Sequence, residues 1–293
     1  MNLECESLGF IPAPATVLHL SVDPLGAVWA AAPAGLFCGR AGEWAAVSGN
    51  FPFTQVACVL SLGKVVLAAG LSGGLLLSRR AGESWQHCFL EQVAAPIACL
   101  AASPNFERDQ ALLAGTGGDG ILRSVNGGQS WQLVNFGLRD FQIFSLATAN
   151  TWEQKEPVFA GSAHGVYYSP NGGRAWRASG LEQAVVLCLG LHSDFLHNPV
   201  VLAGTEDQGL WRSADGGVQW TQVDLPGEQT LTCNALYTQA DAWLLATSEA
   251  GILISHDQGI SWSASGLSAT PVLSLAGNGD NLYAAAYQQG VFR

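Results

Sequence analysis

An eight-residue segment recurs at a near-constant period along most of the chain, and this repeat constrains the fold more than any other feature. Its clearest copy reads S-A-D-G-G-V-Q-W, and recognisable copies lie at 78–85, 124–131, 169–176, 213–220 and 255–262. A shorter remnant ends at Trp44. The closing tryptophans, at positions 44, 85, 131, 176, 220 and 262, are 41 to 46 residues apart. A period in this range is typical of a propeller blade.

The octet has the composition of a hairpin turn. The Asp or Asn at its third position accepts hydrogen bonds from nearby backbone N–H groups, and the glycines permit the positive φ angles of a tight turn. The tryptophan covers the turn with a large apolar face. We therefore expect a structural role, rather than a ligand-binding one, for the octet residues Asn126, Trp131, Asn171, Trp176, Asp215, Trp220, Asp257 and Trp262.

Each repeat contains four short strand signals, which in the fifth repeat are 185–191, 200–204, 209–213 and 220–223. The pattern predicts an all-β fold, a seven-bladed β-propeller of four-stranded antiparallel blades in a single domain over 1–293. The predicted blades are about 15–49, 54–91, 96–137, 141–181, 184–226, 230–266 and 270–293. The last repeat supplies only three strands, so we expect the segment 1–14, with a strand at 3–11, to complete it. That pairing would close the ring and cover its open sheet edge.

Charge and composition limit the classes of partner. The net charge is −11, and Lys and Arg together number 12, which argues against nucleic-acid binding and docking on anionic lipid. We interpret the negative net charge as a feature that keeps the protein soluble; the alternative is that it marks an acidic ligand-binding site. The N-terminus lacks the basic and apolar regions of a secretory signal, and no run is long enough to span a bilayer. We expect a cytoplasmic monomer without membrane insertion.

Cysteine usage gives no sign of a disulfide framework or a zinc knuckle, because the seven cysteines lack paired short spacings. Aligning the repeats instead predicts a ring of small or polar residues at one equivalent position: His19, Cys58, Cys99, Ser145, Cys188, Cys233 and Ser274. Two interpretations stand. The ring is a metal or thiol site, or it consists of small side chains that fit a crowded strand, where free cysteine behaves as a small hydrophobe. The second is favoured, and no metal is expected.

The octets resemble the Asp-box, or BNR, repeat S-x-D-x-G-x-x-W. Before each octet, an A-G-T or A-G-S segment is followed by a G-[VIL]-[YFLW]-x-S strand, as at 113–124, 159–169 and 202–213. These segments are similar to those of the same propeller family. This resemblance covers nearly the whole chain and implies the propeller fold. Its members include sialidases, xyloglucan-cleaving hydrolases, sorting-receptor ectodomains and photosystem II assembly factors, so it implies no single function.

This chain differs from the enzymatic members of that family in the residues and domains with which they bind their substrates. The sialidase Arg-Ile-Pro motif has its counterpart in Phe10-Ile11-Pro12, with phenylalanine in place of arginine. The xyloglucanase-like enzymes place substrate between two propellers, whereas this chain has length for one. The chain also lacks the arginine-rich patch of the photosystem-assembly propellers.

Two candidate binding surfaces follow from connectivity. Loops between second and third strands lie around the axis on one face and form a predicted acidic rim of Asp119, His164, Glu206, Asp207, Glu249, Tyr287 and Gln288. It suits a cation, a basic peptide or a sugar, or consists only of solvated turn residues. On the other face, longer insertions at 103–110, 150–157 and 192–199 each carry an aromatic residue: Phe106, Trp152 and Phe195. These aromatics form a protein-docking patch, or each pins its own loop.

The function that these features predict is a noncatalytic binding or scaffolding propeller that engages a protein or peptide. We expect no cofactor and no catalytic residue. The alternative is a carbohydrate-binding or glycoside-hydrolysing propeller that uses carboxylates of the acidic rim.

Overall fold

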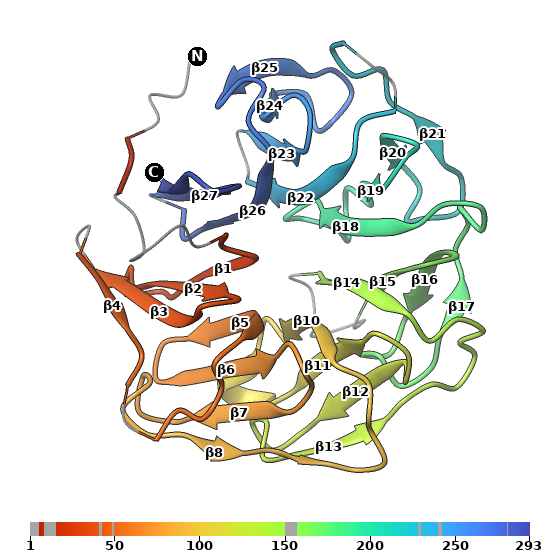
Figure 1. Cartoon of the computed structure of the whole chain (residues 1–293). Helices are drawn as coiled ribbons and strands as arrows, with labels where there is room; N and C mark the ends of the chain where they lie inside the picture. The colour runs from red at the N-terminus through yellow and green to blue at the C-terminus, as the bar shows by residue number, and fades with distance from the viewer. Residues whose placement is uncertain are drawn as a thin grey trace.

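Seven small antiparallel sheets surround a central axis, and successive sheets along the chain are neighbours in the ring (Figure 1). The computed structural model describes residues 6–8, 16–40, 43–48, 50–149, 157–227, 230–239, 242–279 and 281–293. The predicted seven-bladed all-β propeller is confirmed. Within the described ranges the one α-helix is the four-residue α1, Phe106–Asp109.

The strands follow the predicted order from the axis outward in each blade. Blades 1 to 3 contain β1 (His19–Val22), β2 (Val28–Ala32), β3 (Gly35–Arg40), β4 (Glu43–Ala46); β5 (Val56–Leu62), β6 (Val65–Gly70), β7 (Leu75–Ser78), β8 (Gln86–His87); and β10 (Ile97–Ala102), β11 (Leu112–Thr116), β12 (Ile121–Ser124), β13 (Ser130–Leu133). Blades 4 and 5 contain β14 (Ile143–Thr148), β15 (Val158–Ser162), β16 (Gly165–Ser169), β17 (Arg177–Ala178); and β18 (Val186–Leu191), β19 (Val201–Thr205), β20 (Leu210–Ser213), β21 (Thr221–Gln222). Blades 6 and 7 contain β22 (Cys233–Thr238), β23 (Trp243–Thr247), β24 (Ile252–Ser255), β25 (Ser263–Gly266); and β26 (Val272–Gly277), β27 (Leu282–Ala286), β28 (Gly290–Phe292).

Blade 3 has a fifth strand that the sequence did not predict. Strand β9 (Phe89–Leu90) leaves the outer edge of blade 2 and pairs in parallel with β13, so that Phe89 lies opposite Ser130. The segment from β8 to β9 therefore links two blades along the outside of the ring.

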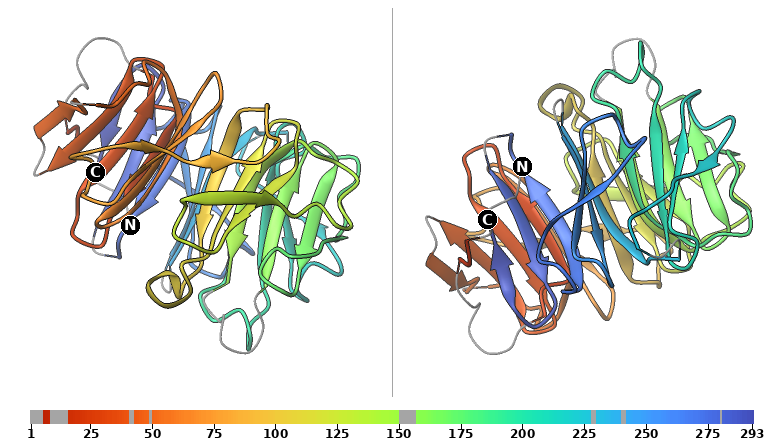
Figure 2. Two further views of the ribbon diagram at one scale, coloured as in Figure 1. Left: turned by 90° about the horizontal axis from the view of Figure 1, so that it is seen from below. Right: turned by 90° about the horizontal axis from the view of Figure 1, so that it is seen from above.

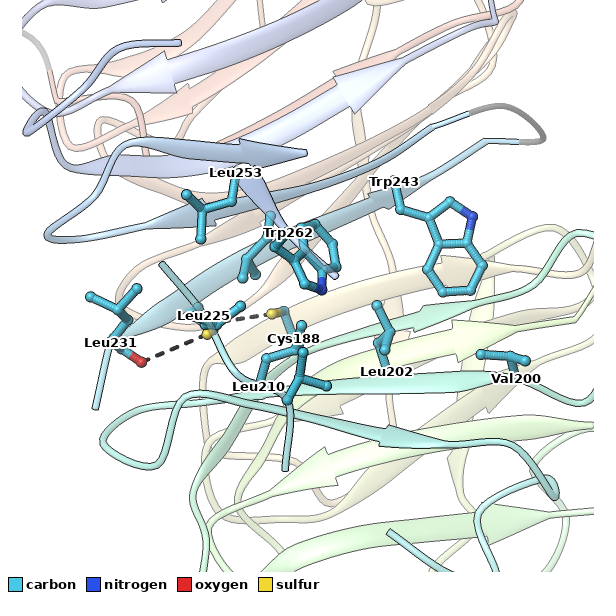
Figure 3. Packing of buried hydrophobic residues seen from close by; sticks show 12 residues of the cluster. Cys188, Val200, Leu202, Leu210, Leu225, Leu231, Trp243, Leu253 and Trp262 are labelled. Carbon is cyan, nitrogen blue, oxygen red and sulfur yellow. Dashed lines mark hydrogen bonds between the residues drawn. The ribbon is translucent and has the colours of Figure 1, made fainter. Parts of the chain in front are cut away.

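The hydrophobic core is divided among the junctions between blades. Second strands such as β11, β15, β19 and β23 are buried along their whole length, because both faces of each blade pack against a neighbour. Each of the seven junctions holds its own cluster of buried side chains. In Figure 3, Leu253 and Trp262 of blade 6 lie across from Leu202 and Leu210 of blade 5. A single blade has no core of its own.

The octets form the predicted turns. In blade 5 the Asp215 carboxylate accepts hydrogen bonds from the backbone N–H groups of Val218 (3.1 Å) and Gln219 (2.9 Å), and from the Ser213 hydroxyl (2.8 Å). The Gln219 N–H is the main cause of the lowered pKa of Asp215. Gly217 has φ of 86° and donates its N–H to Ser213 Oγ (2.8 Å). These contacts hold the hairpin between β20 and β21 closed.

The octet tryptophans do more than cover their own turns, because they reach the preceding blade. Trp131, Trp176 and Trp262 are buried in the junctions with blades 2, 3 and 5, respectively. Trp176 Nε1 donates to the Val134 carbonyl of blade 3 (3.0 Å), and Trp220 Nε1 donates to the Ser179 carbonyl of blade 4 (2.6 Å). The octet therefore stabilises both a hairpin and a junction.

The two faces of the ring carry different loops. Backbone bonds from Gly127 to Gln110 (3.0 Å) and from Gly216 to Pro199 (2.8 Å) place the octets beside the loops that join first to second strands. We call this side the octet face. The opposite side, the rim face, carries the loops from second to third strands and the connections between blades. Side views show the strands running between these two faces (Figure 2).

The ring closes through packing of blade 7 on blade 1, since Val291 and Tyr283 share a cluster with Val28 and Phe37. Near this junction, residues 6–8 lie against β28. Ser7 forms an antiparallel bridge with Phe292, while backbone N–H groups of Glu6 and Leu8 donate to the carbonyls of Arg293 and Val291 (both 3.0 Å). No strand is assigned at residues 6–8, and the rest of 3–11 lies outside the described residues. The closing N-terminal strand stays a prediction.

Deleting residues 3–11 tests that prediction. The deletion removes these two backbone hydrogen bonds and a third, from the Arg293 N–H to the Glu6 carbonyl (2.9 Å), and it exposes the outer edge of β28. We therefore expect the melting temperature to fall by roughly 5–10 °C or the protein to aggregate. Deleting only residues 3–5 is the matched control, because it leaves the bonds of Glu6 and Leu8. Calorimetry with light scattering measures both effects. A monomeric 3–11 deletion of unchanged stability would contradict the closure.

Candidate functional site

The rim face is built on a repeated hydroxyl contact. At the end of the second strand in blades 3 to 6, a buried Thr or Ser donates its side-chain O–H to a backbone carbonyl across the turn. The pairs are Thr116 with Gly120 (2.9 Å), Ser162 with Gly165 (3.1 Å), Thr205 with Gly209 (2.7 Å) and Thr247 with Gly251 (3.0 Å). This contact fixes the turns from which the predicted rim residues project.

Two of the predicted rim carboxylates bind their own blades. Asp119 Oδ2 accepts hydrogen bonds from the backbone N–H groups of Ala94 (2.8 Å) and Ala95 (2.7 Å). Glu249 Oε2 accepts one from the N–H of Thr232 (3.0 Å). In both cases the carboxylate anchors the segment that enters the first strand of the blade. These acidic residues are used to order loops.

His164 has a partner that the sequence did not predict, since its Nδ1 lies within hydrogen-bonding distance (3.0 Å) of Oδ2 of the largely buried Asp140 side chain. Burial alone would raise the pKa of Asp140, but the backbone N–H of Gln142 and the His164 and Ser162 side chains together hold it below its ordinary value. The pair connects two segments of the blade 4 rim.

The remaining rim residues are open to solvent. Glu206 and Asp207 are adjacent and exposed, and the Glu206 backbone N–H is bound to the Val185 carbonyl (3.0 Å). Tyr287 is 44% exposed and is followed by Gln288, whose φ is 55°. The structure thus places all seven predicted residues on one face without joining them into one cluster. No group of three His, Cys, Asp or Glu side chains in the described ranges is arranged to hold a metal ion.

The three loops predicted to carry a docking patch differ from that expectation. Phe106 and Phe195 are only 8% and 7% exposed. Phe106 packs into the junction of blades 2 and 3, and Phe195 stacks edge-on against Phe159, with ring centroids 5.6 Å apart. Both rings therefore pin their own loops and offer no exposed surface to a partner. Trp152 lies outside the described residues.

The predicted ring of small residues is correct at six positions and wrong at one. In most blades the ring residue follows a β-bulge and lies opposite a Gly or Ala, as Cys99 lies opposite Gly115 and Cys188 opposite Gly204. In blade 6 this register belongs to Ala235, which lies opposite Ala246. Cys233 lies opposite Thr247, one position before the bulge. The correction removes one thiol from the proposed ring.

Packing explains the ring residues. A Cβ built on Gly115 would be 2.6 Å from both Cys99 Sγ and Ile143 Cγ2, so there is no room for larger side chains where these strands meet. Burial raises the pKa of the Cys99 and Cys233 thiols to about 12, and it raises those of Cys58 and Cys188 as well. A thiol with a raised pKa is a poor nucleophile and a poor metal ligand at neutral pH. The ring therefore serves packing.

Three of the cavities that are lined by described residues lie away from the rim. One of about 450 Å³ lies at the junction of blades 7 and 1, beside Leu8, Trp44 and Tyr283. Another of about 450 Å³ lies on the outside of blade 5, beside Arg212, Asp215 and Ile260. The third, of about 290 Å³, opens at the axis on the octet face and is lined by the ends of β14, β18 and β22. None of them is lined by a predicted rim residue.

Comparison with known proteins supports the class that this geometry defines, a seven-bladed propeller with Asp-box turns. A family profile for the BNR/Asp-box repeat matches residues 253–264, which contain the blade 6 octet. A comparison with curated protein sequences gives no match. No helix in the described part of the chain is long and apolar enough to cross a bilayer.

Solved structures share the fold at low sequence identity. The extracellular domain of the putative one-component system BT4673 from B. thetaiotaomicron superposes with a TM-score of 0.76 at 14% identity, over 100% of this chain and 40% of that one. YCF48 bound to D1 peptide gives 0.73 at 16% identity, over 97% and 94%. The GH74 xyloglucanase from Xanthomonas campestris gives 0.74 at 14% identity, over 98% and 53%. This chain therefore spans about half or less of two of these three proteins.

Thiol labelling tests the packing role of the ring cysteines, Cys58, Cys99 and Cys188, together with Cys233, which is buried outside the ring. We expect Cys58, Cys99, Cys188 and Cys233 to resist iodoacetamide at pH 8 in the native protein, because burial removes both access and thiolate. The same residues should react fully in guanidinium chloride, which is the control. Peptide mass spectrometry gives the labelled fraction at each cysteine. Rapid native labelling of Cys99 would instead indicate a functional thiol on the axis.

Proposed function

We propose that the protein is a noncatalytic binding propeller whose partner is a protein or peptide. Its most repetitive polar residues, those of the octets, are used to hold hairpins and junctions. The rim residues Asp119 and Glu249 are used to order loops. What the ring offers to a partner is two faces of loops on a rigid scaffold, an arrangement suited to binding.

The carboxyl groups whose pKa is shifted give no support for hydrolysis. Glycoside hydrolysis needs a carboxylic acid whose pKa is raised so that it can protonate the leaving group. In the described residues, the carboxyl groups with a shifted pKa are Asp140, Asp194, Asp215 and Asp257, and every shift is downward. For Asp257, hydrogen bonds from the Ser261 hydroxyl and backbone N–H lower the pKa to about 2. Such groups act as acceptors rather than as proton donors.

The structural neighbours favour a peptide over a glycan, although at their low identity they establish only the fold. YCF48, which matches this chain over nearly the full length of both, was solved with D1 peptide. The xyloglucanase is almost twice as long as the part that matches this chain. A single propeller of this size is therefore supported as a peptide-binding unit.

The alternative is a carbohydrate-binding or glycoside-hydrolysing propeller. One observation favours it: Glu206 and Asp207 are adjacent and exposed, and among the described residues their carboxylates make no hydrogen bond to their own blade, unlike those of Asp119 and Glu249. Sugar hydroxyls are bound by carboxylates of this kind.

The cellular location is part of the proposal. The six cysteines in the described ranges are all free thiols, which suits the reducing cytoplasm that the sequence predicts. One structural neighbour is an extracellular domain, so a localisation experiment has to distinguish the cytoplasm from export.

Parallel selection on peptides and glycans tests the function. Immobilised protein is exposed to a random peptide display library, a glycan array and a panel of glycosidase substrates. We expect enrichment of a peptide motif, with a Kd of roughly 1–100 μM, and no hydrolysis. Unfolded protein, coupled in the same way, is the control for nonspecific capture. A glycan hit or a hydrolysed substrate that is lost in Glu206→Gln, with unchanged melting temperature, would overturn the proposal.

A further inference from the structure

The outer edges of blades 2 to 4 are covered by other segments of the chain at the octet tryptophan. In blade 2 the Asn50 side chain accepts a hydrogen bond from the Trp85 N–H (3.0 Å) and donates one to the Trp85 carbonyl (2.7 Å). In blade 4 the Trp176 N–H donates to the Phe136 carbonyl (2.8 Å). These contacts satisfy backbone groups that point away from their own blade.

Blade 3 uses a whole strand for the same purpose. Strand β9 runs parallel to β13, with Leu90 opposite Trp131, and the Phe89 N–H donates to the Gln129 carbonyl (2.9 Å). Leu90 packs with Trp131 in the junction of blades 2 and 3, and Trp131 is only 1% exposed. A parallel strand at this edge therefore bonds the backbone and covers the tryptophan.

Blade 5 presents the same edge without a cover, on the outside of the ring at β21 (Figure 1). Among the described residues, no hydrogen bond reaches the backbone N–H or carbonyl of Trp220. Trp220 is also partly exposed, whereas the tryptophans of the other four octets are buried. Trp262 of blade 6 likewise lacks a backbone partner within the described ranges, but its ring is already covered. Blade 5 thus combines an open edge with an open aromatic ring.

The backbone groups on this edge match those that β9 binds in blade 3. Val223 donates its N–H to β20 (2.8 Å), so alternation along the strand turns the backbone groups of Gln222 and Trp220 outward. Val218 lies two residues before Trp220, so its carbonyl also points outward, at the position that Gln129 has in blade 3. The acceptor that holds β9 therefore has a counterpart in blade 5.

A cavity beside this edge leaves room for a side chain. Thr221 pairs with Arg212 of β20, and both line the cavity of about 450 Å³ together with Gln219 and Ile260. Side chains alternate along a strand, so residues 219 and 221 face this cavity, whereas Trp220 faces the junction with blade 4. A strand paired with β21 presents one residue to the Trp220 ring and the next to the cavity.

We propose that the outer edge of β21 receives an extended peptide as a parallel fifth strand of blade 5, with an apolar side chain on the Trp220 ring. The residue before that side chain donates its N–H to the Val218 carbonyl. The chain's own β9 argues for this occupant, because it pairs in parallel with the same edge in blade 3 and places Leu90 on the tryptophan. In this mode main-chain bonds give affinity and alternate side chains give specificity. The inference rests on the proposed peptide-binding function and gives the peptide a place and a backbone conformation.

A peptide taken from the chain itself tests the site directly. It has the sequence of residues 86–92, with serine in place of Cys88 and blocked ends, and it is titrated into isotope-labelled protein and followed by amide NMR. We expect saturable shifts of the Trp220 and Gln222 amides, with a Kd of roughly 1–10 mM. The attached β9 keeps its place on β13, because its effective concentration is high. Shifts confined to other blades, or no saturation up to about 20 mM, would overturn the proposal.

N-methylated peptides separate strand pairing from nonspecific contact. Methylation of the phenylalanine nitrogen removes the N–H that corresponds to the donor of Phe89, and we expect at least about tenfold weaker binding. Methylation of the leucine nitrogen is the matched control, because this N–H points away from β21 in the paired strand. Replacing the leucine by aspartate should also weaken binding, since a charge then lies on the Trp220 ring. Equal binding of the two N-methylated peptides would overturn strand addition.

A proline closes the edge in the protein. Proline is tolerated on an edge strand where the missing N–H faces solvent, and it prevents pairing with a further strand. We expect Gln222→Pro to abolish the shifts and Gln222→Ala to keep them. Both variants lose the side-chain bond to the Gln208 carbonyl (2.8 Å), but alanine keeps the backbone N–H. Melting temperatures confirm that each variant is folded, and equal binding by both would overturn the site.

The peptide selection separates this inference from the proposed function. Selected peptides that bind Gln222→Pro and Gln222→Ala equally would support the function and overturn the edge site. Binding of the probe peptide at the edge, without any selected peptide, would support the edge site and overturn the function. Failure of both would overturn both. Shifts of the Trp220 amide on concentrating the protein alone would identify a second copy of the chain as the occupant and overturn the peptide.

Discussion

The structure depends on burial of both faces of every blade. Each second strand is buried from end to end, and its neighbours are supplied by the blades on either side. Because each blade completes the core of the next, the chain is stable only as a ring. The close approach of Cys99, Gly115 and Ile143 shows how tightly two blades interlock, since even one added methyl group has no space there. Closure of blade 7 on blade 1 extends this constraint to the ends of the described chain.

This constraint explains why the most conspicuous residues of the sequence are structural. An octet holds a hairpin through its Asp or Asn and a junction through its tryptophan, and both contacts recur in blades 3 to 6. The small axial residues follow from the same crowding.

Sequence periodicity predicted the blades well because the octet marks the same hairpin in each repeat and the strands alternate with period two. The same alternation explains the error at Cys233. The pattern assumes an unbroken period of two, but the bulge between Cys233 and Ala235 places these residues on opposite faces of the blade, Cys233 in the junction with blade 5 and Ala235 in the junction with blade 7. Register was therefore beyond what the sequence pattern specifies.

The candidate sites were less predictable. Connectivity correctly predicted that the rim residues lie on one face. It did not predict that the Asp119 and Glu249 carboxylates accept hydrogen bonds from backbone N–H groups of their own blades. The loop aromatics Phe106 and Phe195 lie in junction clusters, because an aromatic ring gains more from burial in a core than from exposure on a loop.

Native-state hydrogen exchange on Gly115→Ala tests the closed, interlocked ring most directly. The added methyl group strains the junction of blades 3 and 4 and should lower the free energy of unfolding by about 1–3 kcal/mol. In a cooperative ring, the slowest-exchanging amides of blade 7, such as those of β26, lose the same free energy of opening as those of β11, although they lie far from the substitution. A loss confined to blades 3 and 4, with β26 unchanged, would show that the blades open independently and would contradict the account.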